Sequence, residues 1–352
     1  MRLLITGCAG FVGSALARHT VLDLGWSVVG VDAMTYAATR ESLLAVEGNP
    51  RFELIVADIR DQDAMAALLA RVQPEAIAHL AAETHVDRSI DDPEAFLQAN
   101  VIGTHRLARA ALTYRDTLPA ADADRFRFLH VSTDEVFGAL GPTGAFSEAS
   151  AYAPRSPYAA SKAASDHFVR AFHETFGLPV LISNCSNNYG PFQFPEKLIP
   201  LMILNGLEGR PMPLYGDGLQ VRDWIAVEDH AAALALILEK GAVGETYLVG
   251  GRCERTNRAL VEALCAELDR LAPAAAAHAR LITPAPDRPG HDRRYAIDPS
   301  KIEQLCGWRA RMSLEEGLMR TAVWYARNAC WWTPLREGRY QGQRLGLGKQ
   351  GA

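Results

Sequence analysis

Short apolar runs recur through the first half of the chain, and helical patterns separate them. The runs occupy residues 2–6, 27–31, 52–56, 76–80, 127–131 and 179–183. Strands buried on both faces appear as continuous apolar runs, and their alternation with helices is typical of a parallel sheet covered by helices. The pattern therefore predicts an α/β fold with a Rossmann-like, doubly wound parallel sheet.

After about Asn187 this rhythm ends, and proline and glycine cluster in "YGPFQFPEK", "GRPMPLYGDG" and "TPAPDRPGHD". Such clusters favour loops, so we expect a smaller, loop-rich C-terminal substrate domain over the carboxyl edge of the sheet. The expected division is a Rossmann-like domain over 1–187 with about 226–250, a substrate domain over 188–225 and 251–335, and a tail over 336–352. "HAAALALILEK" predicts a short buried helix.

Composition narrows the class of protein. With 352 residues, of which 49% are hydrophobic and 22% charged, the chain matches an ordinary globular protein. A net charge of -5 provides no general basic field for nucleic acid or an anionic membrane, and no apolar run reaches membrane-spanning length. The six cysteines show no CxxC pair and no histidine at metal-ligand spacing. We expect reduced thiols, no metal site and a cytoplasmic protein.

The first apolar run leads into a glycine-rich turn, "LLITGCAGFVGS", with Gly7, Gly10 and Gly13 before a helical segment. Glycines there permit a tight turn and close approach of a pyrophosphate to the helix N-terminus. The second strand ends at Asp32, whose carboxylate is placed to accept hydrogen bonds from a ribose diol and to repel a 2′-phosphate. NAD is therefore favoured over NADP, although Arg40 lies nearby. Asp32 could instead be a turn residue at a strand end.

Asp58 follows the third predicted strand, in "VADIRD". A contact with the adenine side of the cofactor is expected at this position. Asp58 could equally cap the helix that begins near Asp61.

The segment "RSPYAASKAASDHFVRAFHETFG" predicts a helix with Ser156 as N-cap, Pro157 at the first position and Gly177 at its end. Tyr158 and Lys162 fall four residues apart, on one face. For the phenol to act as a base at neutral pH, its pKa must fall by roughly three units, about 4 kcal/mol, which a nearby ammonium and a nicotinamide cation favour. Alternatively, Tyr158 and Lys162 are an ordinary pair of surface residues on an amphipathic helix.

The fifth run stops at Thr133, Asp134 and Glu135 in "HVSTDEVFG". On its own, this ending is typical of helix initiation, because Thr caps free amides and acidic residues suit the positive end of a helix dipole. Together with the glycine turn and the Tyr–Lys pair, it suggests chemistry instead.

These residues resemble the extended short-chain dehydrogenase/reductase family, whose pattern is a glycine turn, a Ser or Thr after the fifth strand, and YxxxK. The likeness covers nearly the full length and is closest to the dTDP-glucose 4,6-dehydratase branch. Matching segments are "TGCAGFVGS", "DAMTYA", "AAETHVDRSI", "STDEVFG", "SPYAASKAASD", "NNYGPFQFPEKLIPL", "QVRDWIAVEDH" and "RPGHDRRYAID". The chain departs from that pattern at Thr84, Ala99, Phe192 and Gln193.

The resemblance implies a hydro-lyase with tightly bound NAD that converts dTDP-glucose to dTDP-4-keto-6-deoxyglucose and water. Its steps are oxidation at C4, loss of water across C5 and C6, and reduction at C6. By the same resemblance Tyr158 takes the C4 hydroxyl proton, Thr133 holds that oxygen and Lys162 orients the ribose. Asp134 is the acid and Glu135 the base, which requires burial and mutual repulsion to raise the pKa of Asp134.

The resemblance also implies two sets of binding residues. The cofactor set is Gly7, Gly10, Phe11, Val12, Gly13, Asp32, Ala33, Thr35, Asp58, Ile59, Leu80, Ala81, Ala82, Thr84, Ala99, Tyr158, Lys162 and Asn187. The substrate set is Thr84, His85, Thr133, Asp134, Glu135, Asn187, Lys197, Leu198, Pro213, Leu214, Tyr215, Arg222, Asn257, Arg288 and His291. Of these, Arg222 and Arg288 offer the positive charge that a diphosphate needs, although an isolated arginine is often a surface charge.

Helical segments 102–116 and 162–176 carry apolar stripes. The resemblance implies that they build the four-helix interface of a homodimer, whereas the stripes alone would equally allow internal packing. The product of such an enzyme feeds dTDP-rhamnose biosynthesis in many pathways and other deoxysugars elsewhere.

Two alternatives remain open at this level. The first is a 4,6-dehydratase or epimerase that acts on a UDP-, CDP- or GDP-linked sugar, because the sequence does not identify the residues that recognise the nucleobase. The second is a nucleotide-sensing protein that keeps the fold without catalysis. The second alternative predicts damage at Tyr158, Lys162, Asp134 or Glu135, and all four are intact.

Overall fold

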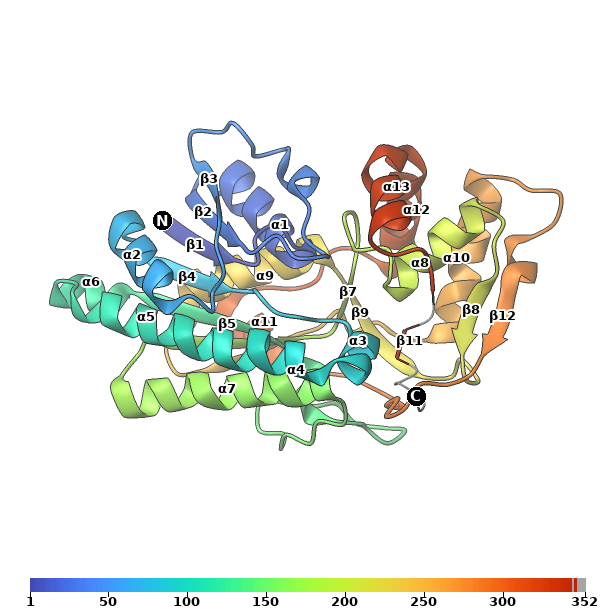
Figure 1. The fold of residues 1–352 in the computed structure, drawn as a ribbon. Helices are drawn as coiled ribbons and strands as arrows, with labels where there is room; N and C mark the ends of the chain where they lie inside the picture. Colours follow the sequence, from blue (N-terminus) through green and yellow to red (C-terminus); the bar gives the residue numbers. More distant parts are fainter. Residues whose placement is uncertain (344, 347–352) are drawn as a thin grey trace.

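The computed structural model describes residues 1–343 and 345–346, so part of the predicted tail, residue 344 and residues 347–352, lies outside the described residues. Its centre is a parallel seven-stranded sheet in the order β10-β6-β5-β4-β1-β2-β3 (Figure 1). The strands are β1 (Arg2–Thr6), β2 (Ser27–Asp32), β3 (Phe52–Val56), β4 (Ala76–His79), β5 (Arg127–Thr133), β6 (Val180–Cys185) and β10 (Thr246–Val249). The predicted doubly wound α/β sheet is confirmed.

Helices cover both faces of the sheet, which explains why its strands appear as continuous apolar runs. On one face lie α1 (Phe11–Arg18), α9 (Val227–Lys240) and α11 (Ser300–Cys306); on the other lie α2 (Gln62–Val72), α5 (Thr104–Asp116) and α7 (Pro157–Phe176). Alternate residues of β1 serve the two cores, since Leu3 and Ile5 pack on the first side and Leu4 on the second.

The long helix α7 begins and ends where the sequence predicts. The Ser156 hydroxyl accepts a hydrogen bond from the Ala159 amide at 3.1 Å, Pro157 is the first helical residue, and Gly177 ends the helix with a φ of 68°. "HAAALALILEK" lies in the buried helix α9, as predicted. Segment 102–116 is less regular, because the π-helical turn Leu97–Gly103 precedes α5.

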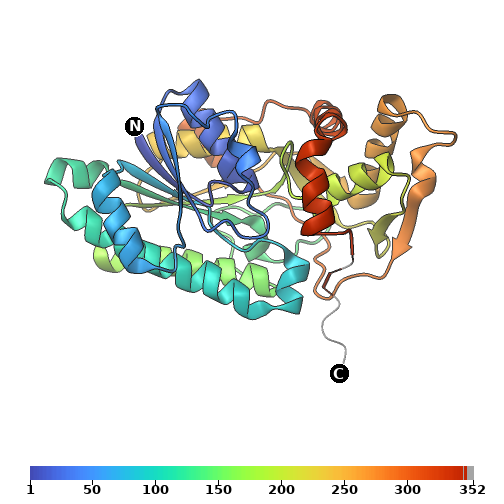
Figure 2. The same cartoon turned by 45° about the horizontal axis from the view of Figure 1, so that its top comes forward.

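The C-terminal third stands beside the carboxyl edge of the sheet (Figure 2). It contains the three-stranded sheet β11-β9-β7, the pair β12-β8 and a helical layer that shares one apolar core. The elements are β7 (Asn187–Tyr189), α8 (Leu198–Leu207), β8 (Met212–Tyr215), β9 (Val221–Ala226), β11 (Glu254–Thr256), α10 (Asn257–Leu271), β12 (Ile282–Ala285), α12 (Leu314–Arg327) and α13 (Ala329–Gly338). The division into two domains stays a prediction.

Three short helices complete the fold between and beside the strands: α3 (Val86–Asp91), α4 (Pro93–Phe96) and α6 (Ala120–Arg125). Within the described part of the chain, every helix is too short or too polar to traverse a bilayer. All six cysteines are free thiols.

Gly13→Ala tests the close packing of the glycine turn. A Cβ on Gly13 would stand 2.1 Å from the Gly7 carbonyl oxygen, a separation that forces the turn apart. We expect a loss of about 1–3 kcal/mol of stability, with less NAD retained through purification. Thermal unfolding and the NAD content of the protein measure both. Gly141→Ala is the matched control, because nothing lies within 4 Å of that Cβ; equal stability of the two variants would contradict the expectation.

Candidate active site

The carboxyl ends of four strands bring the sequence motifs to one edge. The glycine turn follows β1, Asp32 ends β2, segment 80–82 follows β4, and Thr133 ends β5. The strand order reverses between β1 and β4, and ligands of open α/β sheets bind at such a switch point. Motifs that are up to 126 positions apart (133 − 7 = 126) in the chain therefore meet.

The glycine turn and Asp32 form one hydrogen-bonded unit. Gly10 is the N-cap of α1, and Gly7 has a φ of +70° and lies so close to Ala81 that a Cβ would stand 2.7 Å from the Ala81 amide nitrogen. The buried Asp32 carboxylate accepts hydrogen bonds from the amides of Ala9 at 2.9 Å and Met34 at 2.8 Å. Asp32 therefore stabilises the turn at the end of the strand, and its remaining lone pairs can accept hydrogen bonds from a ribose diol.

The glycine turn at the α1 N-terminus fits a dinucleotide, because Gly7, Gly10 and Gly13 carry no Cβ and the first amides of the helix have no side-chain cap. The predicted cofactor residues occupy this turn and the neighbouring strand ends. Phe11 and Val12 begin α1, Ala33 and Thr35 follow β2, and Ala99 lies in the π-helical turn before α5. These contacts stay predictions.

Asp58 does not cap the following helix. Its carboxylate pairs with the Arg60 guanidinium at 2.6 Å, and this hydrogen bond lowers the pKa of Asp58. The cap of α2 is Asp61, which accepts from the Ala64 amide at 3.0 Å. The capping alternative for Asp58 is therefore wrong, and the predicted adenine contact stays open. Arg40, at the surface, pairs with an acidic neighbour 3.4 Å away.

Tyr158 and Lys162 are buried near the first turns of α7, so they are not a surface pair. The Lys162 ammonium donates to the Val131 carbonyl oxygen at 2.9 Å, and burial lowers its pKa to about 8. Burial and the nearby Glu135 raise the pKa of Tyr158 well above its usual value, while a hydrogen bond with Thr133 opposes the rise. The lowered pKa expected for Tyr158 is therefore not found in the protein itself, where burial dominates.

The strand β5 continues to Thr133, two residues beyond the predicted run. Asp134 and Glu135 then open the 3₁₀ turn Asp134–Phe137, in which adjacent residues project about 120° apart. The Thr133 hydroxyl accepts from the Glu135 amide at 3.3 Å, so the turn is capped as helix-starting residues would be. Capping and chemistry coexist at this strand end.

The two adjacent carboxyls differ in their surroundings. Burial first, and then the charge of Glu135, raises the pKa of Asp134 well above its usual value. This direction confirms the condition stated for an acid that arrives protonated. Burial also raises the pKa of Glu135, but three cations counteract it: Arg288, Arg222 and Lys197. A carboxyl with a strongly raised pKa therefore lies beside a carboxyl that faces positive charge.

The three cations are held by other parts of the chain. Lys197 donates to the Thr84 carbonyl oxygen at 2.8 Å, and Arg222 donates to a loop carbonyl at 3.0 Å. Arg288 pairs with the buried Asp87 at 3.2 Å, and Tyr215 donates to the other oxygen of that carboxylate at 3.2 Å. Asp87 thus links two predicted nucleotide-site residues that lie 73 positions apart (288 − 215 = 73).

The remaining predicted substrate residues come from several elements. His85 caps α3, and Asn257 begins α10 with a buried side-chain oxygen that has no hydrogen-bond partner among the described residues. His291 contacts Asp287 at 2.6 Å. The others begin β7, begin α8 or lie in β8: Asn187, Leu198, Pro213 and Leu214. Their assignment to the substrate stays a prediction.

Sequence reasoning missed a cluster that joins the two halves of the site. The Tyr36 hydroxyl donates to Glu196 at 2.8 Å, and Arg88 donates to the other oxygen of the same carboxylate at 2.8 Å. The Arg88 guanidinium lies 3.9 Å from the centre of the Tyr36 ring. No local spacing signals these contacts, because their partners are 108 and 160 positions apart. The loop after β2 is thereby fixed next to Lys197.

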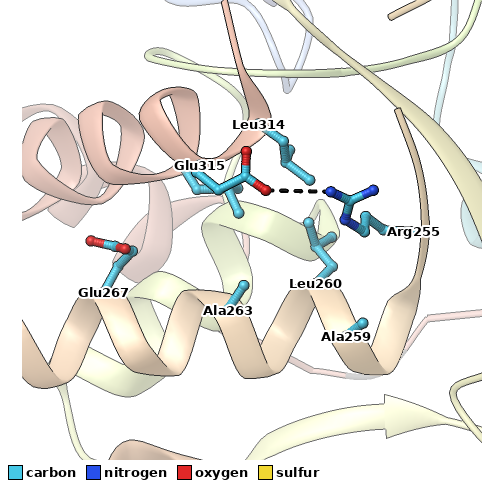
Figure 3. A pocket seen from close by; sticks show the side chains of 8 residues that line it. Arg255, Ala259, Leu260, Ala263, Glu267, Leu314 and Glu315 are labelled. Carbon is cyan, nitrogen blue, oxygen red and sulfur yellow. Dashed lines mark hydrogen bonds and ion pairs between the residues drawn. The ribbon is translucent and has the colours of Figure 1, made fainter. Parts of the chain in front are cut away.

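A small cavity lies elsewhere, between α10 and α12 (Figure 3). Its volume is about 50 Å³, and the ion pair of Arg255 and Glu315, 3.3 Å long, crosses it above Leu260 and Leu314. Ligand pockets usually measure about 300–1,000 Å³. This cavity is too small for a nucleotide sugar and lies apart from the strand-end site.

The strand order, glycine turn and buried Thr–Tyr–Lys group define a dinucleotide-dependent enzyme of the extended short-chain dehydrogenase/reductase class. The family model described as GDP-mannose 4,6 dehydratase matches residues 4–321. A dTDP-glucose 4,6-dehydratase of Neisseria meningitidis serogroup B is 50% identical over 99% of both chains. The chain belongs to the family of dTDP-glucose 4,6-dehydratases.

Solved structures agree with this family and separate it from the epimerases. DesIV, a dTDP-glucose 4,6-dehydratase from Streptomyces venezuelae solved with NAD, has a TM-score of 0.86 and 44% identity over 95% of this chain and 100% of that one. A Thermus thermophilus UDP-glucose 4-epimerase solved with NAD has a TM-score of 0.81 but 28% identity, over 93% of this chain and 100% of that one. The fold is shared, while the sequence is closer to the dehydratase.

Asp32→Asn tests the double role of this carboxylate. The amide nitrogen of Asn would face a backbone N–H, leaving one amide without an acceptor, so we expect a loss of about 1–3 kcal/mol of stability and weaker NAD retention. Thermal unfolding with and without added NAD measures both. Asp61→Asn is the control, since Asn is as good an N-cap as Asp. Unchanged stability and NAD content in the Asp32 variant would contradict the role.

Proposed function

We propose that this chain converts dTDP-glucose to dTDP-4-keto-6-deoxyglucose and water, with the residue roles given below. Its family membership supports the substrate and the reaction. The observation that carries the mechanism is the pair of adjacent carboxyls beside Tyr158: Asp134 is buried and has a raised pKa, and the partly buried Glu135 faces cations. An epimerase of the same fold needs the tyrosine and the lysine but has no need of an acid and a base at C5 and C6.

NAD is the cofactor, and when bound it accepts two electrons from the sugar and later returns them. The glycine turn holds its pyrophosphate, Asp32 accepts from its ribose, and Lys162 orients the second ribose. The glycines at positions 7, 10 and 13 and the uncapped first amides of α1 support this placement. A carboxylate at Asp32 disfavours a 2′-phosphate.

At C4, Tyr158 takes the hydroxyl proton while Thr133 holds the same oxygen. The hydrogen bond between Thr133 and Tyr158 supports this pairing. Protonated Lys162 adds a positive charge next to the ribose, which favours loss of the phenol proton once the nicotinamide cation is close. The resulting ketone makes the C5 proton acidic.

At C5 and C6, Glu135 removes the C5 proton, and Asp134 protonates the C6 hydroxyl as water leaves. After C6 is reduced, Glu135 returns a proton to C5. The proton that Tyr158 took from the C4 hydroxyl balances the one that Asp134 gave to the departing water, so the cycle releases no net proton. The three cations that face Glu135 allow it to act as a base despite its burial.

Product analysis tests the substrate and the reaction. We expect the purified protein, without added NAD, to dehydrate dTDP-glucose in deuterated water and to place one deuterium at C5. Mass spectrometry compares it with UDP-, CDP- and GDP-linked sugars. Faster dehydration of another nucleotide sugar would refute the substrate, and epimerisation without loss of water would refute the reaction.

Asp134→Asn and Glu135→Gln test the acid and the base. Each substitution keeps the side-chain shape but removes proton transfer, which contributes about 10²–10⁴-fold to such steps. We expect dehydration to fall within that range while C4 oxidation persists, seen as reduced-nicotinamide absorbance on the enzyme. Glu148→Gln serves as a control at a glutamate outside the proposed site. Dehydration by both variants at the wild-type rate would refute the assignment.

The wider setting is also part of this proposal. We place the enzyme in the cytoplasm as a homodimer, with its product entering dTDP-rhamnose or another deoxysugar pathway. The exposed Phe168 and Phe176 on α7 support an interface there, because large apolar side chains in contact with solvent favour association. The inner side of α7 packs against α5 within the chain.

A further inference from the structure

A buried polar network lies beneath the catalytic end of β5, centred on Asp166 of α7. One carboxylate oxygen accepts hydrogen bonds from Ser132 at 2.9 Å, Tyr152 at 2.8 Å and Asn184 at 3.3 Å. The other oxygen lies 3.1 Å from a ring nitrogen of His130. Asp166 has no exposed surface, so its carboxylate is surrounded by protein groups and is out of contact with solvent.

Two further bonds join the network to the strand that carries the catalytic residues. Lys162, one helical turn before Asp166, donates to the Val131 carbonyl oxygen at 2.9 Å. The Asn184 amide donates to the Thr133 carbonyl oxygen at 3.0 Å. With the Ser132 bond, the network contacts three successive residues of β5, directly before the acid and base.

The acidic group whose charge acts on Lys162 is Asp166, one helical turn further along α7. The titratable groups on α7 and on the elements around it include Tyr158, Asp166, His167, Arg170, His173 and Glu174 on α7, Asp134 and Glu135 on the 3₁₀ turn, His79 on β4, His130 on β5, Cys185 on β6, His105 on α5 and Tyr152 in the loop before α7. Arg170 donates to the Tyr152 hydroxyl at 2.8 Å. Burial lowers the pKa of His130 to about 4 and raises that of Cys185 to about 12, so both are neutral. Burial lowers the pKa of Lys162, and Asp166 opposes this.

We propose that Asp166 is a positioning residue whose buried carboxylate keeps the Lys162 ammonium protonated and holds the end of β5 that carries Thr133, Asp134 and Glu135. The inference rests on the proposed function, because it gives Lys162 an active, protonated form. Asp166 itself touches neither sugar nor cofactor and acts through Lys162 and Ser132. Burial raises the pKa of Asp166, but hydrogen bonding with His130, the charge of Lys162 and the hydrogen bond from Tyr152 bring it below its usual value.

The charge part of the proposal has a definite sign. Removing a negative charge next to an ammonium makes proton loss easier, so Lys162 would lose its proton at a lower pH. If the active enzyme needs protonated Lys162, the pH at which kcat falls on the alkaline side must also become lower. A purely structural role for Asp166 would lower activity at every pH and leave the position of that fall unchanged.

Asp166→Asn measures this shift. In the wild type we expect kcat for dTDP-glucose dehydration to fall on the alkaline side near the Lys162 pKa of about 8. In the variant the midpoint should lie about one pH unit lower. An unchanged midpoint would overturn the charge role. The wild type is assayed in parallel, so a failure of the proposed function appears as an inactive wild type, separately from any shift.

Ser132→Ala separates the positioning part, because it removes a hydrogen bond to Asp166 without changing any charge. We expect kcat to fall about tenfold or more, while KM and the alkaline midpoint stay at their wild-type values. An unchanged kcat would overturn the positioning role.

Lys162→Arg gives a second test of the charge part if Asp166→Asn does not fold. Its guanidinium keeps its proton, so the alkaline fall of the residual activity should disappear, and its persistence would overturn the assignment. Thermal unfolding confirms that each variant is folded.

Discussion

Burial of charge at the carboxyl end of β5 is the constraint on which the rest of the site depends. An ionised group away from water is costly unless it is neutralised or paired. Asp134, Tyr158 and Lys162 are buried there, and Glu135 is partly buried. The protein meets the constraint differently for each group. Burial raises the pKa of Asp134, Glu135 faces cations from the C-terminal part of the chain, and the charge of Asp166 acts on Lys162. In the proposed mechanism these different surroundings separate the acid from the base.

The parallel sheet is what allows this separation. Because every strand of the main sheet runs in one direction, the glycine turn, Asp32 and Thr133 end at the same edge although long helices separate them in the chain. The C-terminal elements then supply Arg222 and Arg288 from the opposite side. Negative groups come from the sheet and positive groups from its cover, so the charges balance only when both parts are in place.

The local parts of this design could be predicted from the sequence, whereas the distant ones could not. The strands, the caps of α7 and the turn at Asp32 follow from apolar periodicity and capping chemistry within a few residues. The apolar run 127–131 leaves out the last two residues of β5, because Ser132 and Thr133 are polar. Both nevertheless pair with β6 in the sheet. Asp87 carries no sequence signal for its role, since its partner Arg288 is 201 positions away.

Thr133 shows why a structural interpretation and a chemical one need not compete. Its hydroxyl accepts from the Glu135 amide and also bonds with Tyr158. A residue that starts the 3₁₀ turn thereby fixes the directions of both carboxyls before any substrate binds. Preorganised groups spend no free energy on reorientation during the reaction. The turn at the end of β5 therefore serves the chemistry because it is an ordinary capped turn, and the buried network below it keeps that turn in register with the tyrosine and the lysine.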